Sequence, residues 1–435
     1  MTDLFAARSQ MALSLGFHIV FAVVGMGMPL LLVLSEALWL RTGAAVWREL
    51  AQRWAKGTAI MFAVGAVSGT ILSFELGLLW PSFMQFAGPM VSLPFSLEGF
   101  AFFLEAIFLG IVLYGWDRVS PRAHWLAGVG VWLSGMASGV FVVSANAWMN
   151  APTGYHHTAD GQLVVDPVAA MLNPAFGPQA LHMAMAALVS TAFLVAGVHA
   201  WYLLRTPRNA FHRAGFALAL VVATITAFLQ PLTGHEAAAF VAEAQPTKLA
   251  AAEAWWPTER RAPLTIGGWP DEEAETTRWA LEIPGLLSLL AFSELDAEVK
   301  GLAEVPRDLR PPVAVVHLAY QVMLGLGMAM VAGAGLASLL WAWRRELPTD
   351  RWVLWGFVLL APAGLIAVEA GWVVTEVGRQ PWVIQGVLRT ADAVTPMPGI
   401  TVTFWLHLAV YLVLSVLTLL LLRRQFHHAP SAEEA

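Results

Sequence analysis

Residues 96–116 read SLEGFAFFLEAIFLGIVLYGW, and this stretch decides the fold class. It is apolar around its whole circumference and slightly longer than the roughly 20 residues that a helix needs to cross the hydrocarbon core of a bilayer. Its two acidic residues, Glu98 and Glu105, are the only formal charges in it. The stretch therefore predicts a membrane-spanning helix rather than a helix of a soluble domain.

Eight further stretches have the same character. They are Met11–Leu38, Thr58–Trp80, Trp125–Trp148, Gln179–Leu203, Ala214–Thr233, Val313–Trp343, Trp352–Thr375 and Ile400–Leu422. Several begin or end in Trp, as expected at a membrane–water interface. The composition agrees, because only 12% of the 435 residues are charged, against about 25% in soluble domains. We predict one all-α, polytopic membrane domain, residues 1–435, of about nine transmembrane helices.

Composition also excludes several classes of site. The chain has no cysteine, which excludes disulfides, thiolate-bound zinc, iron–sulfur clusters and covalent haem attachment through C-x-x-C-H. The net charge is −6 and no basic run is present, so no nucleic-acid partner is expected. Any metal centre must use His, Met or carboxylate ligands.

The basic residues predict the orientation. Fourteen Lys and Arg fall in the segments on one side of the predicted membrane, whereas the short segments on the other side carry only Arg8, Arg379 and Arg389. The positive-inside rule places the N-terminus outside and the C-terminus in the cytoplasm. The connection Gly234–Pro311 has 78 residues with 14 acids and 7 bases, and we predict it to be an extracytoplasmic loop. Loops of this length are usually functional.

Ionisable residues inside spans are costly and mark candidate sites. The predicted topology puts five potential ligands from five helices near the outer leaflet, with Arg379 at the same level. They are His18, Glu98, His182, Met323 and Glu376. Imidazole plus thioether ligation suits a haem for electron transfer, and a single strong ligand leaves an iron position free. The hypothesis of a haem site rests on the depth that these residues share, because each residue taken alone has a simpler explanation.

The simpler explanations differ between residues. A lone buried His more often packs or hydrogen-bonds than binds metal, and Met is a common core residue; His199, His317 and His407 are interpreted as structural. Glu75 and Glu369 have no partner that the sequence reveals. Glu98 and Glu105 are seven residues apart, hence on one helix face about 10 Å apart. They could relay protons or simply pair with neighbouring helices. No intramembrane His pair is expected, which disfavours a haem–copper site.

At the level of motifs, the chain resembles subunit I of the cytochrome bd-type quinol oxidases, over nearly its whole length. The most specific stretch is GWVVTEVGRQPW at 371–382. Other matches are PFSLEGFAFFLEAIFLGIVLYGWDR from Pro94, NAWMNAP from Asn146, and TKLAAAEAWW from Thr247 in the long loop. FELGLLWPSFM from Phe74 and the short loop are similar to the cyanide-insensitive branch.

The resemblance implies roles by position. His182 and Met323 match the axial ligands of a low-spin haem b. His18, with Glu98 beside it, and Glu376, with Arg379 and Trp372 nearby, match the ligands of two high-spin haems. One of these would be a haem b and the other a haem d or a further haem b. Lys248 and Glu253 match loop residues tied to quinol oxidation. Glu105 matches a proton-pathway acid, and Lys56 the cytoplasmic end of that pathway. Many relatives have Arg where this chain has Gln321.

The resemblance implies an electrogenic, non-pumping quinol:O₂ oxidoreductase of the bacterial cytoplasmic membrane, which reduces oxygen with cytoplasmic protons. Its partners would be a second integral subunit, ubiquinol or menaquinol, and O₂, and a small single-helix subunit stays open. A dihaem b-type electron carrier or quinone reductase without oxygen chemistry is the alternative, and an ion or solute transporter is a third. Three points stay open: whether the haem at the oxygen site is of type d or b, which high-spin haem lies at His18 and which at Glu376, and the type of quinone.

Overall fold

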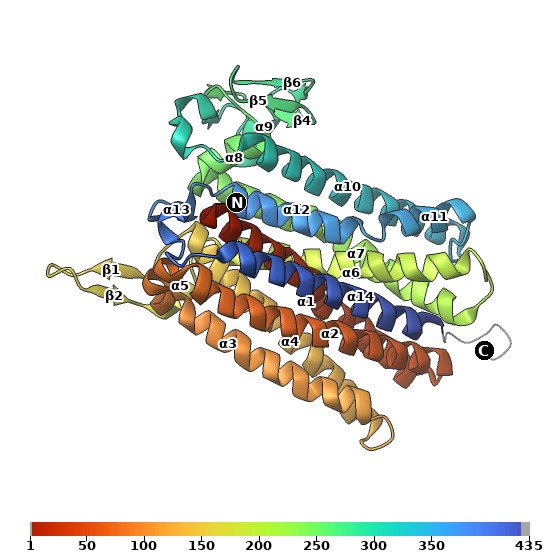
Figure 1. Ribbon diagram of the computed structural model, residues 1–435. Coiled ribbons are helices and arrows are strands. Elements are labelled where there is room, and N and C mark those ends of the chain that lie inside the picture. Colours follow the sequence, from red (N-terminus) through yellow and green to blue (C-terminus); the bar gives the residue numbers. More distant parts are fainter. Residues whose placement is uncertain (1, 428–435) are drawn as a thin grey trace.

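The computed structural model describes residues 2–427, and within them lie nine helical segments long and apolar enough to cross a membrane (Figure 1). They are α1 (Asp3–Thr42), α2 (Ala45–Leu79), α3 (Pro81–Tyr114), α4 (Pro121–Asn150), α6 (Phe176–Leu203), α7 (Ala210–Ala244), α10 (Val313–Arg344), α11 (Arg351–Leu360) with α12 (Ala363–Val377), and α14 (Ile400–His427). The predicted helical membrane bundle is thereby confirmed.

Local sequence explains where the helices begin and end. The Thr2 hydroxyl accepts a 3.3 Å hydrogen bond from the Phe5 N–H at the start of α1, which ends before Gly43 in the left-handed region at φ +71°. The Ser120 hydroxyl caps α4 in the same way, and Pro121 follows it at the first helical position. These caps satisfy N–H groups that the first turn leaves unpaired.

Several predicted boundaries differ from the structure, and three of them have a clear physical reason. Helix α3 begins at Pro81 rather than Ser96, and α7 continues to Ala244 rather than Thr233, so the first residues of the predicted loop are helical. Hydropathy marks only the hydrocarbon-crossing part of a helix, whereas the Ala-rich segment after Thr233 favours further helix. The predicted span Trp352–Thr375 is interrupted at Ala361 and Pro362, because proline lacks the N–H that continues a helix.

Small residues allow the helices to approach closely. The main core cluster joins α1, α2, α6, α7, α10 and the α11–α12 pair. A Cβ added to Gly27 on α1 would lie 2.3 Å from the Thr191 hydroxyl of α6, and one added to Gly364 on α12 would lie 2.4 Å from the Ser190 Cα. Glycine at these contacts lets backbones pack where lipid-like side chains alone give little driving force.

The connections gather at the two ends of the bundle, and one end carries nearly all the extra structure (Figure 1). We call it the loop end, because it holds the N-terminus, the β1–β2 hairpin, and the segment between α7 and α10. Its short helices are α5 (Pro167–Met171), α8 (Pro246–Glu253), α9 (Leu286–Phe292), α13 (Thr390–Ala393) and the 3₁₀ turns η1 (Leu302–Glu304) and η2 (Arg307–Leu309).

The strands of the loop end form five antiparallel two-stranded ribbons, paired β1–β2, β3–β8, β4–β7, β5–β6 and β9–β10. Their bounds are β1 Tyr155–His157, β2 Leu163–Val165, β3 Glu259–Arg260, β4 Leu264–Ile266, β5 Trp269–Asp271, β6 Thr276–Arg278, β7 Leu281–Ile283, β8 Glu298–Val299, β9 Trp382–Ile384 and β10 Leu388–Arg389. The long connection is therefore a folded segment with a buried core of its own, around Leu249, Trp255 and Leu287.

Candidate functional site

His182 and Met323 occupy two helices that flank α12. The His182 Nδ1 lies 3.3 Å from the Thr233 hydroxyl and 3.2 Å from the Gln230 amide nitrogen, both on α7. The Met323 sulfur faces α12, where a Cβ at Gly371 would come within 3.1 Å of it. Each candidate ligand is thus held against a neighbouring helix, and at Met323 the facing position admits only a small residue.

The two side chains also lie at one depth. Gly364 of α12 contacts Ser190 of α6. His182 precedes Ser190 by eight residues and Gly371 follows Gly364 by seven, which takes both about 10–12 Å further toward the loop end. Met323 lies against that same Gly371. Imidazole and thioether at one level on α6 and α10 fit the two axial positions of a low-spin haem.

Polar atoms and glycines around this pair support the fit. The Gln230 side-chain oxygen beside His182 is buried and has no hydrogen-bond partner among residues 2–427. A Cβ at Gly234 would approach the His182 ring to 3.2 Å, so glycine preserves room there. An unpaired buried acceptor and a wall of small residues are features that fit a bound prosthetic group.

His18 lies on α1 and faces α2. Its Nδ1 is 3.0 Å from the Ser68 hydroxyl, and a Cβ at Gly69 would lie 3.0 Å from its ring. Glu369 of α12 reaches the same part of α1, since its Oε2 would lie 3.3 Å from a Cβ at Gly16, and its Oε1 is buried without a partner in the described structure. Sequence reasoning gave Glu369 no partner. Its spacing of two helical turns from Glu376 was the available signal.

Glu98 and Glu105 both face α4. The Ser138 hydroxyl donates a 3.3 Å hydrogen bond to Glu98, and a Cβ at Gly135 would lie 3.2 Å from the Glu105 carboxyl. Glu105 is buried, with 6% of its surface exposed. The two carboxyls therefore follow one interhelical seam, with Glu105 further from the loop end, while Lys56 is exposed toward the opposite end of α2.

Where α12 ends, the buried Arg379 forms an ion pair with Glu376, whose side chain is 29% exposed. Arg379 donates a 2.5 Å hydrogen bond to Glu376 Oε2, and the Asn146 amide of α4 donates to Oε1. Two further guanidinium nitrogens of Arg379, Nε and Nη1, are buried without partners in the described part of the chain. A carboxylate retains free lone pairs after two hydrogen bonds, so Glu376 can still bind a metal ion. Trp372 packs nearby, against the cluster around Ile19 and Val23.

Lys248 of α8 lies at this same end of α12. Its ammonium donates to the Asn150 side-chain oxygen at 2.6 Å and to Gln245 at 2.8 Å. Burial and the nearby Arg379 charge lower the Lys248 pKa to about 7, against the opposing effect of Glu376. A cavity of about 150 Å³ opens beside Lys248, Arg379 and Trp382. The loop lysine thus contacts the surroundings of Glu376, which the sequence did not reveal.

Glu253 lies on another face of α8 and points to different neighbours. It is fully buried, the Thr265 N–H donates to its Oε2 at 3.4 Å, and the Tyr320 hydroxyl donates to the same carboxyl. Its Oε1 has no partner within residues 2–427. Burial raises the Glu253 pKa to about 7, and these hydrogen bonds only partly oppose that effect. The structure therefore does not bring Lys248 and Glu253 into one hydrogen-bonded group.

Helix α10 holds the loop segment around Glu253. The Gln321 side chain accepts from the Gly267 N–H and donates to the Thr265 carbonyl, both at 3.0 Å. The two ring nitrogens of His317 lie 2.8 Å and 3.0 Å from the carbonyl oxygens of Ala252 and Gly267. Gln321 is thus a backbone anchor for the loop in this chain, and His317 has the structural role that the sequence suggested.

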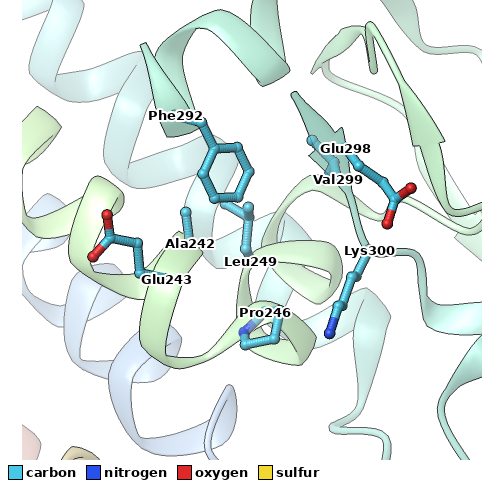
Figure 2. Close-up of a pocket in the computed structure, with 8 residues that line it drawn as sticks. All are labelled: Ala242, Glu243, Pro246, Leu249, Phe292, Glu298, Val299 and Lys300. Atoms are coloured by element: carbon cyan, nitrogen blue, oxygen red, sulfur yellow. The ribbon is translucent and has the colours of Figure 1, made fainter. Parts of the chain in front are cut away.

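A second cavity lies beside Pro246 and Leu249 of α8 (Figure 2). It has a volume of about 230 Å³, and its apolar wall contains Leu249 and Phe292. Glu243, Glu298 and Lys300 also line it. Neither Lys248 nor Glu253 is among its lining residues, so the cavity does not coincide with the predicted loop site.

His199 and His212 form a buried pair with their Nδ1 atoms 3.0 Å apart, which the sequence did not reveal. Only His199 lies in a predicted span, so the expectation that no intramembrane His pair is available for copper is not contradicted. The pair was not evident because the two residues lie at the ends of successive helices, which the α6–α7 hairpin brings together. The nitrogens facing each other are already in contact, and the pair lies at the end of α6 far from His182.

The site and the fold together define a class, namely a polytopic helical membrane protein with partly buried His, Met and Glu side chains suited to haem. The chain belongs to the cytochrome bd terminal oxidase subunit I family, whose sequence profile it matches over residues 6–430.

Named relatives agree with this assignment. It is 39% identical to the putative cytochrome bd menaquinol oxidase subunit I of Bacillus subtilis, over 100% of this chain and 99% of the relative. It is 28% identical to the cytochrome bd-II ubiquinol oxidase subunit 1 of Escherichia coli, over 99% and 97%. Among solved structures, the bd oxidase from Geobacillus thermodenitrificans superposes with a TM-score of 0.93 at 37% identity, covering 98% of this chain and 99% of that one.

Proposed function

We propose that this chain is the haem-bearing subunit of a terminal quinol oxidase in a bacterial cytoplasmic membrane. The reaction would oxidise two quinols to two quinones and reduce one O₂ to two waters. The single observation that carries the proposal is the arrangement of candidate ligands, with His182 and Met323 level across α12 and Glu376 hydrogen-bonded at its end. Family membership and full-length relatives named as quinol oxidase subunits support it.

The candidate ligands divide into two kinds. His182 and Met323 would hold a low-spin haem b, whereas His18 and Glu376 would each hold a high-spin haem, of type b or d. Haem, when bound, supplies the one-electron couples and the open iron position that oxygen reduction requires. Two buried nitrogens of Arg379, Nε and Nη1, have no partner within residues 2–427 and would donate to an anionic substituent at the Glu376 position.

Quinol would bind at the loop end. The cavity beside Lys248 is lined by amide donors, a lysine, a guanidinium and Trp382, a combination suited to a polar ring. We assign Lys248 and Glu253 to hydrogen-bonding the quinol hydroxyls and accepting their protons; because the two residues face different neighbours, this requires movement of α8 or successive contacts. The loop, residues 234–311, would lie outside the membrane as part of the single domain.

Protons for oxygen reduction would arrive from the opposite, cytoplasmic end. Glu105 and then Glu98 line the α3–α4 seam in that order, and Lys56 lies beyond them. Release of quinol protons outside and uptake inside would generate a membrane potential without pumping. A second integral subunit would complete the complex.

The test uses the full complex purified from membranes. We expect a reduced-minus-oxidised spectrum with low-spin and high-spin haem signals, and quinol-driven oxygen uptake. A complex without haem would contradict the proposal. A haem-loaded complex that oxidises quinol but consumes no oxygen would instead establish the dihaem electron carrier.

A further inference from the structure

The hydrogen bonds of one residue, Asn150, connect the loop to the α12 site. Its side-chain oxygen accepts from Lys248 at 2.6 Å and from Gln245 at 3.2 Å. Its side-chain nitrogen donates to the Asn146 carbonyl at 3.0 Å and to the Asn146 side-chain oxygen at 3.2 Å. The Asn150 amide therefore has partners on both its acceptor and its donor side, on two different parts of the chain.

The chain of contacts continues to the candidate haem ligand. The amide nitrogen of Asn146 donates to Glu376, whose other oxygen accepts from Arg379. From the loop to the end of α12 the order is Lys248, Asn150, Asn146, Glu376. Asn146 and Asn150 are four residues apart in the last turn of α4, so one rigid helix end holds both amides.

The residues that make these hydrogen bonds on the loop side are buried. Asn150 is 2% exposed, Lys248 4% and Gln245 3%. Away from water a hydrogen bond is stronger, and an amide that loses its partner there stays unpaired rather than being solvated. Displacing Lys248 would therefore leave the Asn150 oxygen with only the longer bond from Gln245. A shift of the Asn150 amide in response would alter its bonds to Asn146 and, through Asn146, the contact with the Glu376 carboxylate.

We infer that Asn150 is a positioning residue that couples α8 to Glu376. The position of Lys248 then sets the orientation of the Glu376 carboxylate, which is the candidate ligand of a high-spin haem. The inference rests on the proposed function. It goes beyond that function, because it makes a loop residue outside the helix bundle control a ligand-bearing helix end.

The experiment measures the haem environment rather than turnover. Lys248→Met and Asn150→Leu are prepared in the complete complex, together with the double variant, and the high-spin absorption bands and carbon monoxide affinity are recorded. Both single changes break the same chain of contacts. We therefore expect each to shift the bands and to change carbon monoxide affinity by about threefold or more, with no further change in the double variant.

The matched control is Asn173→Leu. Asn173 is also buried at the loop end, but its side chain bonds to backbone groups, namely the carbonyls of Ser144 and Ala170 and the N–H of Ala175. We expect it to leave the high-spin bands unchanged. If the complex with Asn150→Leu does not assemble, Asn150→Asp replaces it in the test. The aspartate keeps an acceptor oxygen for Lys248 but has no N–H to donate to Asn146. It should then shift the bands.

The outcomes separate the inference from the proposed function. Unchanged high-spin bands in Lys248→Met and Asn150→Asp, in a complex with normal haem content, would overturn the inference and leave the oxidase assignment intact. An unmodified complex without a high-spin haem would overturn the proposed function instead. Equal shifts in the Asn173 control would show a general packing effect and also count against the coupling.

Discussion

Glu253 has the most informative surroundings of any single residue at the loop end, because its carboxyl is fully buried and one of its oxygens lacks a partner in the described structure. Burial raises its pKa to about 7. To accept a quinol proton the group must first be ionised, so kcat/KM for quinol should rise as pH increases through about 7. Glu253→Gln removes the titrating group and should lower kcat/KM by about 10²-fold or more and flatten this rise.

The measurement is quinol oxidation between pH 5.5 and 8.5 with haem content determined for each preparation. Glu298, an exposed acid of β8, supplies the matched control, since Glu298→Gln should keep the pH profile. A Glu253→Gln complex with the original profile would remove Glu253 from proton transfer.

Met323 allows a residue-scale test of the low-spin pair. Met323→Leu keeps the size of the side chain but removes the thioether that faces Gly371. The low-spin haem signal should shift or disappear, while the high-spin bands remain. Met328, an exposed Met of the same helix, serves for comparison, because Met328→Leu should change neither signal. Retention of the full low-spin spectrum in Met323→Leu would refute the ligand assignment.

At the scale of elements, α10 is both the helix of Met323 and the support for the loop. Gln321 pairs with the Thr265 and Gly267 backbone through two 3.0 Å hydrogen bonds, each worth about 1 kcal/mol. Gln321→Leu should loosen this segment and raise the KM for quinol several-fold with little change in haem content. Hydrogen exchange of residues 252–268 measures the loosening directly. Unaltered exchange there would show that His317 and Tyr320 hold the loop without it.

The candidate ligands are spread over several helices of the bundle. Each of α1, α6, α10 and α12 contributes one or two candidate ligands or buried acids, and a small residue on a neighbouring helix faces most of them. The surface of the bundle that faces lipid therefore stays apolar, while each of these helices can supply one ligand to a haem in the interior. Among the described residues, no cluster of three or more His, Asp or Glu offers a complete metal site.

For the whole molecule, the prediction concerns orientation. The chain has no cysteine, so a single introduced thiol can be labelled without background. Gln162→Cys, in the exposed hairpin at the loop end, should react with a membrane-impermeant maleimide on intact cells stripped of their outer membrane. Arg122→Cys, at the exposed start of α4, should react only after lysis. The reverse pattern would invert the topology and place the quinol loop in the cytoplasm.

The sequence by itself determined the class of fold and the residue types of the site. Nine long apolar stretches can satisfy their backbone only as helices in a membrane, and polar residues inside them are costly enough to stand out. Helix ends were less predictable, because hydropathy marks the hydrocarbon core and not the helix that continues beyond it, as at Pro81 and Ala244.

Only the tertiary structure decided which of these residues meet. The Lys248 contact with Asn150, the Gln321 contact with Gly267 and the His199–His212 pair all join segments whose spacing in the chain gives no period to detect. Such contacts depend on how helices tilt and how a folded loop docks on them. Packing of small residues against large ones sets that geometry, and no local pattern of hydrophobicity encodes it.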